Sequence, residues 1–303
     1  MVFGFKVYTK RNTHLKWRHV PPEKLQLKTL RVAIIGGTGG IGQGLSRFLS
    51  SKGAEVTVVG RTYRDDDITG INFIEANLEL ISEAQRVAQV LLKQPYDLII
   101  FSTGSIAASS REETVEGLER DMAVSYLNRL VMLRTILPKI ENADTNIVSK
   151  PRIFIIGYPG AGVLGSPDDL NSERHYSAVH AHMNTIAGNE ALVFDCAKRY
   201  PGLSIFGLNP GFIQTSHRDN LLGSGTWKSK LVEGFIGYWF QSVEEYTKHI
   251  APLLVTPDIE GHSPAFFNAK GQAIYSQGFT QHHVEWIIQR SEDLLHKVGI
   301  QSF

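Results

Sequence analysis

The segment that most constrains this chain is the glycine-rich turn Gly36-Gly-Thr-Gly-Gly-Ile-Gly42. It directly follows Arg31-Val-Ala-Ile-Ile, which is typical of a buried strand, and it opens a segment of helical periodicity that runs from Gly40 to about Lys52. Glycines let a pyrophosphate approach the main chain where any Cβ would intrude, and a helix N-terminus offers free N–H groups to phosphates. Between a strand and a helix, this turn predicts a dinucleotide-binding site.

The rest of the chain repeats the order of strand and helix. We expect strands at 31–35, 54–59, 71–76, 97–102, 152–156 and 203–208, and helices at 40–52, 80–93, 112–139 and 174–199. The strands are almost wholly apolar, as expected when helices cover both faces of a parallel sheet. We therefore predict an α/β fold, a doubly wound Rossmann-type sheet of about seven strands with helices on both faces.

The domain organisation follows from the same pattern. Residues 31–303 contain no tandem repeat or linker, so we expect one NAD(P)-binding domain. Residues 1–30 are rich in basic side chains, and we expect a solvated, partly disordered N-terminal extension there.

Composition excludes several classes of function. The formal net charge of the 303 residues is +1, so no overall field would recruit nucleic acid or an acidic membrane. No uncharged apolar run approaches the ~18–20 residues that a membrane-spanning helix needs. Cys196 is the single cysteine, which rules out an internal disulfide, and its helical segment predicts a small buried filler. With no recognisable signal peptide, we expect a cytoplasmic protein.

The end of the second strand indicates which dinucleotide would bind. An NAD site has an acidic residue there for the adenosine ribose, but this strand ends in Val59-Gly-Arg-Thr62 and has no acid before Asp65. The planar guanidinium of Arg61 suits a 2′-phosphate. The sequence thus favours NADP(H) over NAD(H), the alternative being an ordinary solvated loop arginine.

Together with further motifs, these features resemble the short-chain dehydrogenase/reductase family over nearly all of 31–298. The further motifs are Asn77-Leu78, Thr103-Gly104, Tyr176-Ser-Ala-Val-His180 and Leu208-Asn-Pro-Gly-Phe-Ile-Gln-Thr215. More narrowly, the chain resembles a fungal group of this family that includes a yeast aldehyde reductase. The resemblance implies that the cofactor contacts Gly36, Thr38, Gly39, Gly40, Ile41, Gly42, Arg61, Thr62, Asn77, Leu78, Thr103, Gly104, Tyr176, His180, Pro210, Gly211, Ile213 and Thr215.

The catalytic positions implied by the resemblance depart from the family pattern. The family's lysine is His180 here, its asparagine aligns with Ser125, and its serine is replaced by Gly157 or Tyr158. Tyr176 remains. It lies four residues before His180, so the two side chains would share one face of the expected helix. We expect catalysis by Tyr176, His180 and Ser125.

The altered pattern favours carbonyl reduction over alcohol oxidation. Reduction needs a proton donor, which a neutral tyrosine with an ordinary pKa of about 10 already is. His180 would refill that proton or hold the ribose, and Tyr158, Ser125 or Ser166 could stand in for the missing serine. The sequence predicts no metal site, because an i, i+4 histidine pair with a third ligand is absent.

Other features leave alternatives open. The segment 216–251 corresponds to the family's substrate lid, and its aromatic residues would favour an apolar or aromatic carbonyl substrate if some of them face the cleft. A homodimer through the helix carrying the tyrosine is expected by analogy with relatives. Besides a reductase, the sequence is compatible with an NADP(H)-binding protein without turnover and with a non-redox enzyme that retains the nucleotide.

Overall fold

The computed structural model describes residues 9–142, 150–211, 213–214 and 241–300. Its centre is an eight-stranded sheet of order β10-β9-β6-β5-β4-β1-β2-β3, parallel except for the pairing of β10 with β9. The strands are β1 (Arg31–Ile35), β2 (Glu55–Gly60), β3 (Ile71–Glu75), β4 (Leu98–Phe101), β5 (Arg152–Ile156), β6 (Ser204–Leu208), β9 (Ala265–Phe267) and β10 (Ala273–Ile274). The predicted doubly wound α/β fold is confirmed.

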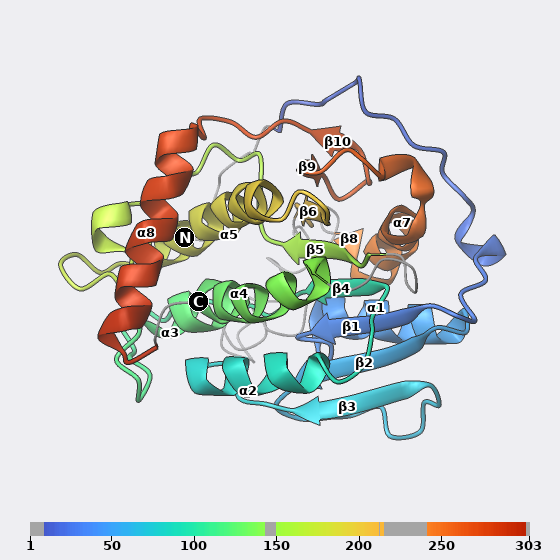
Figure 1. Ribbon diagram of the computed structural model, residues 1–303, viewed down its shortest axis with the longest axis horizontal. Helices are drawn as coiled ribbons and strands as arrows, with labels where there is room; N and C mark the ends of the chain where they lie inside the picture. Colours follow the sequence, from blue (N-terminus) through green and yellow to red (C-terminus); the bar gives the residue numbers. More distant parts are fainter. Residues whose placement is uncertain (1–8, 143–149, 212, 215–240, 301–303) are drawn as a thin grey trace, which may run out of the picture.

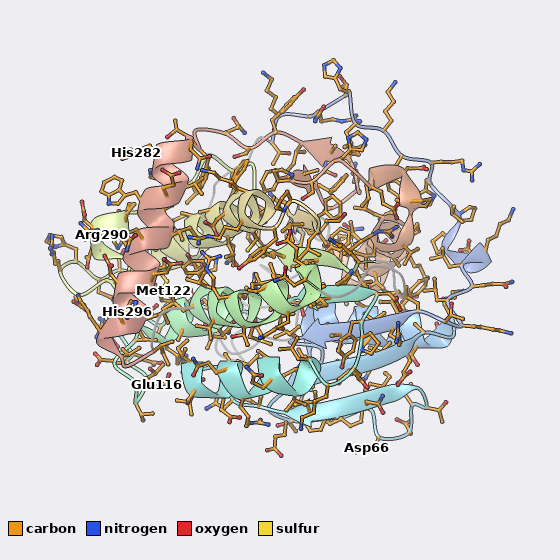
Figure 2. All side chains as sticks on the ribbon, viewed as in Figure 1. Asp66, Glu116, Met122, His282, Arg290 and His296 are labelled. Carbon is orange, nitrogen blue, oxygen red and sulfur yellow. The ribbon has the colours of Figure 1, made fainter. Side chains whose placement is uncertain are left out.

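Helices cover both faces of the sheet (Figure 1). One face is covered by α1 (Gly40–Ser51) and α7 (Val243–Val255), and the other by α2 (Ile81–Leu91), α4 (Asn128–Glu141) and α5 (Ala178–Arg199). The C-terminal helix α8 (Gln281–Lys297) packs on the outside of α5. Figure 2 shows His282, Arg290 and His296 along α8 at the edge of the molecule. No helix in the described ranges is long and apolar enough to cross a bilayer.

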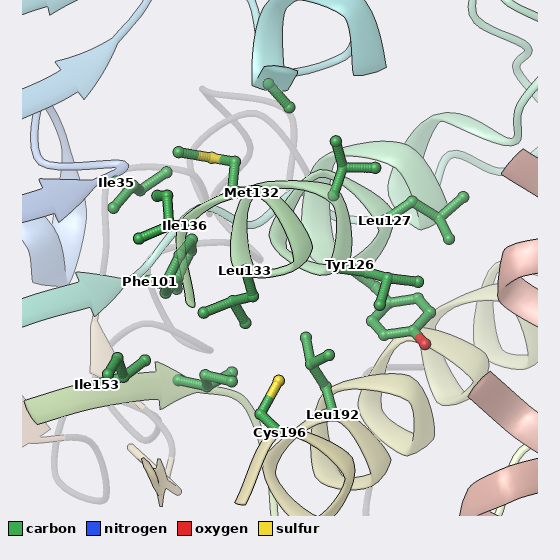
Figure 3. Packing of buried hydrophobic residues seen from close by; sticks show 14 of the residues in the cluster. Ile35, Phe101, Tyr126, Leu127, Met132, Leu133, Ile136, Ile153, Leu192 and Cys196 are labelled. Carbon is green, nitrogen blue, oxygen red and sulfur yellow. The ribbon is translucent and has the colours of Figure 1, made fainter. Parts of the chain in front are cut away.

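The core on the α4 side joins the sheet to two helices. Figure 3 shows Phe101 and Ile153 of the strands facing Leu133 of α4 and Leu192 of α5. Cys196 is buried in this cluster, as predicted, and burial raises the pKa of its thiol to about 12. An inert thiol follows, since the thiolate is the reactive form.

Two predicted helices begin later than expected. The segment 112–119 forms a turn closed by the bond from Thr114 N to Leu118 O, and the helical path starts with the short α3 (Arg120–Met122) and a π-helical stretch, Ala123–Leu127. The helix expected from 174 begins at Ala178, because the Ser177 side chain caps it. Before it, the Asp169 carboxylate accepts backbone N–H groups of 173–175 and holds a turn, the role expected of such an acidic residue.

The N-terminal segment also differs from expectation. Residues 9–30 follow the surface of the domain with most side chains partly or fully exposed, and main-chain and side-chain groups bond to the domain. Arg11 pairs antiparallel with Ile274 at the edge of β10, and Trp17 donates from Nε1 to the carbonyl of Gly271 at 2.7 Å. A free sheet edge is thereby covered.

The predicted lid falls mostly outside the described residues. Of 216–251, the described part from 241 forms β8 (Gln241–Ser242), which pairs with β7 (Ile213–Gln214), and the first turns of α7, which pack on α1. Thr215, expected to contact the cofactor, also lies outside the described residues.

Candidate active site at the carboxyl ends of the strands

The glycine-rich turn lies between β1 and α1, and its first and last glycines are tightly packed against neighbouring backbone atoms. Gly36 has φ +89°, and a Cβ there would come within 2.5 Å of the Thr103 backbone nitrogen. A Cβ on Gly42 would overlap the carbonyl oxygen of Gly36. Gly39, the N-cap of α1, is different, because a Cβ there would meet nothing within 4 Å and no side chain caps the helix. The turn therefore leaves open space above bare main chain at a helix N-terminus, as a pyrophosphate requires.

The end of β2 lies beside this turn. A Cβ on Gly60 would overlap Thr38, so strand end and turn are in contact. Arg61 and Thr62 follow and are exposed, which suits residues that meet an adenosine end. Sequence reasoning missed that Nη1 of Arg61 lies 3.3 Å from a carboxylate oxygen of Glu79. A 2′-phosphate would have to compete with that carboxylate for Arg61.

Residues after β3 and β4 lie at the same carboxyl edge of the sheet as the glycine-rich turn. Asn77 is exposed and Leu78 is buried, with the carbonyl of Leu78 accepting a bond from Asn128. Thr103 is nearly buried, and its hydroxyl oxygen has no hydrogen-bond partner among the described residues. An unpaired buried hydroxyl is a group that a bound ligand would satisfy. The neighbouring Gly104 is exposed.

The segment after β6 is held by Tyr158. The Tyr158 hydroxyl donates to the carbonyl of Gly211 at 2.8 Å, and Gly211 has φ +65°. Pro210 is buried, and Ile213 starts the short β7. Tyr158 thus fixes the Pro-Gly turn, and its proton is already committed to that bond.

The predicted pairing of Tyr176 with His180 is not formed. Tyr176 precedes α5, so the two residues do not share a helix face, and in the described structure no hydrogen bond joins them. The Tyr176 hydroxyl donates to the carbonyl of Ala108 at 2.6 Å, while Nδ1 of His180 lies 3.5 Å from the Ser172 hydroxyl. The pKa of Tyr176 is raised, first by burial and then by nearby carboxylates, Glu119 foremost.

Ser125 belongs to a buried polar cluster that sequence reasoning missed. Its hydroxyl donates to Asp121 and accepts from the backbone N–H of Ser105 at 2.9 Å. The other carboxylate oxygen of Asp121 lies 2.9 Å from Nδ1 of His182. The sequence signal for this cluster is weak, because Asp121 and His182 are far apart along the chain and form no motif.

These positions together fit a nicotinamide dinucleotide. The glycine turn leaves a cradle that a Cβ at Gly39 would fill, and Thr103 has an unpaired hydroxyl at the end of β4. The sheet order reverses between β1 and β4, and ligands of open α/β sheets bind at such a reversal. Among the side chains of the described ranges, no group of three His, Cys, Asp or Glu residues is arranged to hold a metal ion.

Comparison with known proteins supports a redox role. The chain is 43% identical over 297 residues to an uncharacterized oxidoreductase of Saccharomyces cerevisiae, covering 96% of both chains. It is 26% identical over 206 residues to an oxidoreductase of Emericella nidulans, covering 63% of this chain and 60% of that one. No protein-family model matches.

Solved structures share the fold at low sequence identity. One, a short-chain dehydrogenase/reductase family protein, has a TM-score of 0.58 at 18% identity, covering 82% of this chain and 99% of that chain. Another is the NADP active-site complex of RhlG from Pseudomonas aeruginosa, with a TM-score of 0.59 at 18% identity, covering 81% of this chain and 96% of that chain. Likeness at this level shows the fold.

Proposed function

Because this chain belongs to the oxidoreductases, as its yeast relative does, and has the fold of a short-chain dehydrogenase/reductase, we propose that it reduces a carbonyl compound with NADPH. The observation that carries the proposal is the open main-chain cradle at Gly39 beside the end of β4. When bound, the reduced nicotinamide supplies a hydride to a carbonyl carbon. The protein then has to orient the carbonyl and deliver a proton to its oxygen.

The preference for NADPH is supported by Arg61. It is exposed at the end of β2, where an NAD site would have an acidic side chain. A dehydrogenase of Shigella flexneri with the same fold forms a complex with NADP, which adds a fold-level analogy. Glu79 weakens this preference, because its carboxylate pairs with Arg61 and would compete with the 2′-phosphate of NADPH.

The direction of reaction is supported by the surroundings of Tyr176. A raised tyrosine pKa disfavours tyrosinate, the form that would accept a proton from an alcohol. As a proton donor, Tyr176 would first have to exchange its bond to the carbonyl of Ala108. The apolar or aromatic nature of the carbonyl substrate rests on the aromatic residues of 216–251, most of which lie outside the described residues.

A second candidate function is NADP(H) binding without turnover. It is favoured by one observation, that the hydroxyls of both Tyr176 and Ser125 are already bonded within the protein. A non-redox enzyme that keeps the nucleotide as a structural group is a third reading with the same cofactor requirement.

Calorimetry with NADPH and NADH, followed by incubation with NADPH and a panel of aliphatic and aromatic aldehydes, tests the proposal. Gly39→Ala is the decisive variant, because φ −159° suits any residue and its methyl meets no protein atom. We expect unchanged thermal stability and clearly weaker NADPH binding. No affinity of the wild type for either nucleotide would overturn the proposal, and binding without consumption on any aldehyde would favour the second candidate.

A further inference from the structure

Asp121 is a fully buried carboxylate with partners on three segments of the chain. Its Oδ1 accepts hydrogen bonds from the hydroxyls of Ser105, at 2.8 Å, and Ser125. Its Oδ2 lies 2.9 Å from Nδ1 of His182. The two serines and the histidine come from the loop after β4, the π-helical stretch and α5. A buried charge with bonds to both oxygens is held in one orientation.

This cluster lies next to the proposed cofactor cradle. Ser105 follows Thr103 and Gly104 directly, and the Gly36 turn is in contact with Thr103. The backbone carbonyl of Ser125 accepts a bond from the Asn189 side chain, which ties the cluster to α5. The histidine therefore stands near the reversal of strand order, where a substrate carbonyl would meet the cofactor.

The carboxylate determines which ring nitrogen of His182 carries a proton. An ionised carboxylate only accepts, so Nδ1 must donate to Asp121, and Nε2 is left with a lone pair in the neutral ring or a proton in the charged ring. Among the described residues Nε2 has no hydrogen-bond partner, and the side chain is 30% exposed. The nitrogen that can exchange a proton is thus the one that is free to meet a ligand.

We propose that Nε2 of His182 is the proton donor and acceptor of this site, with Asp121 as its positioning residue. The inference rests on the proposed function. In reduction, the carbonyl carbon gains a hydride from the reduced nicotinamide, which becomes oxidised. The C=O π pair moves to oxygen, which takes the Nε2 proton, so that an alcohol and a neutral imidazole result. Water returns the proton, and alcohol oxidation runs the same steps in reverse.

Tyr176 is less suited to this role than His182. Its hydroxyl proton is directed at the Ala108 carbonyl, whereas the exchangeable nitrogen of His182 is free. Other charged groups around the cluster are Glu119, the N-cap of α3, and the buried Arg129 of α4, both of which interact electrostatically with Asp121. Arg120 and Glu112 lie nearby as an ion pair.

Kinetics with NADPH and an aldehyde that the wild type reduces test the catalytic part. We expect His182→Gln to lose about 10²-fold or more in kcat/KM, the scale of general acid catalysis, with NADPH affinity unchanged. His175→Gln, an exposed histidine just before α5, is the matched control and should behave as wild type. Wild-type rates in His182→Gln would overturn the inference while the reductase function stands, whereas a wild type without turnover would overturn both.

A measurement without cofactor tests the positioning part. Long-range ¹H–¹⁵N spectra of the neutral His182 ring should show the proton on Nδ1. In Asp121→Asn, the serine hydroxyls still need an acceptor and would keep the amide oxygen, so the amide NH₂ would face Nδ1. We expect the proton to move to Nε2 and kcat/KM for reduction to fall with it, because a neutral ring with its only proton on Nε2 could donate that proton only by becoming an anion. A proton on Nε2 in the folded wild type would overturn the inference whatever the activity.

Discussion

Nη1 of Arg129 donates a hydrogen bond to the carbonyl oxygen of Ile156 at 2.6 Å, at the carboxyl end of β5. The same nitrogen donates to the side chain of Asn189 at 2.8 Å, and Nη2 donates to the carbonyl of Thr103 beyond β4. The arginine is buried, and burial lowers the pKa of its guanidinium to about 9, which leaves it protonated at neutral pH. The guanidinium group of Arg129 thereby fixes the carboxyl ends of β4 and β5 against α4 and α5, next to the candidate active site.

Replacing Arg129 by Met should lower the free energy of unfolding by about 3 kcal/mol or more, since three buried acceptors would lose their donors. Arg129→Lys should recover part of this, because an ammonium cannot reproduce the planar fork. Urea unfolding measures both values. Arg64→Met is the control and should show little change, because Arg64 is exposed and has no hydrogen bond or ion pair from its side chain within the described residues. A loss in Arg129→Met no larger than in this control would contradict the assigned role.

The strands and the glycine turn could be predicted because their signals are local. An apolar run such as 98–101 needs burial on both faces, and Gly36 needs a positive φ that few other residues adopt. The predicted start of α5, at residue 174, is four residues before the observed one at Ala178. The Ser177 side chain caps the helix and sets its start at Ala178, a local choice between compatible conformations.

The predicted catalytic group depended on that helix start. With Tyr176 outside the helix, spacing of four residues no longer implies proximity to His180. The pair that the structure does form, Asp121 with His182, spans 61 residues, and no periodicity indicates such a contact. Tertiary packing, which brings the π-helical stretch against α5, decides it.

Glu190 gives the protein a stability that depends on pH. Both of its carboxylate oxygens lie 3.1 Å from the backbone nitrogen of Gly160, and the residue is almost fully buried. Burial raises its pKa from 4.5 to about 7, against the opposing effect of the backbone N–H of Gly160. The folded state therefore keeps a proton that the unfolded state has lost, and the resulting stabilisation disappears as pH rises from 4.5 to 7.

The measurable consequence is a difference between the wild type and Glu190→Gln. Relative to this variant, which cannot titrate at 190, the wild type should lose about 3 kcal/mol of unfolding free energy between pH 4.5 and 7.5. Urea titrations at both pH values test it. Glu292→Gln is unsuitable as a control because Glu292 is ion-paired, whereas Glu23→Gln serves, since Glu23 is exposed and has no ion pair within the described residues. A difference that is constant with pH would show that Glu190 is ionised throughout.

The contact of Arg61 with Glu79 predicts opposite effects of two substitutions on cofactor choice. Arg61→Met should weaken NADPH binding about tenfold and leave NADH binding nearly unchanged, since only NADPH has a 2′-phosphate to pair. Glu79→Gln should strengthen NADPH binding, because it releases the guanidinium. Calorimetry with both nucleotides measures the ratios, with Arg64→Met, a nearby exposed arginine, as the control. Tighter binding of NADH than NADPH by the wild type would refute the NADPH preference.

The outer surface of α5, the helix expected to carry the tyrosine and to form the predicted homodimer, packs against the chain's own α8. Arg134 of α4 is buried and lies 2.7 Å from Asp195 of α5 and 2.9 Å from Glu292 of α8. A dimer through this surface would have to displace α8 and separate that buried arginine from a carboxylate. We therefore expect light scattering to give a monomer, or a dimer whose hydrogen-exchange protection lies away from α4 and α5.

Arg134→Met should destabilise the fold by about 3–5 kcal/mol, as loss of one partner from a buried ion pair does, and should loosen α8 enough to cause concentration-dependent association. Lys198→Met, which breaks only an exposed pair between α5 and α8, should do neither, and a wild-type dimer protected along α4 and α5 would show that α8 gives way.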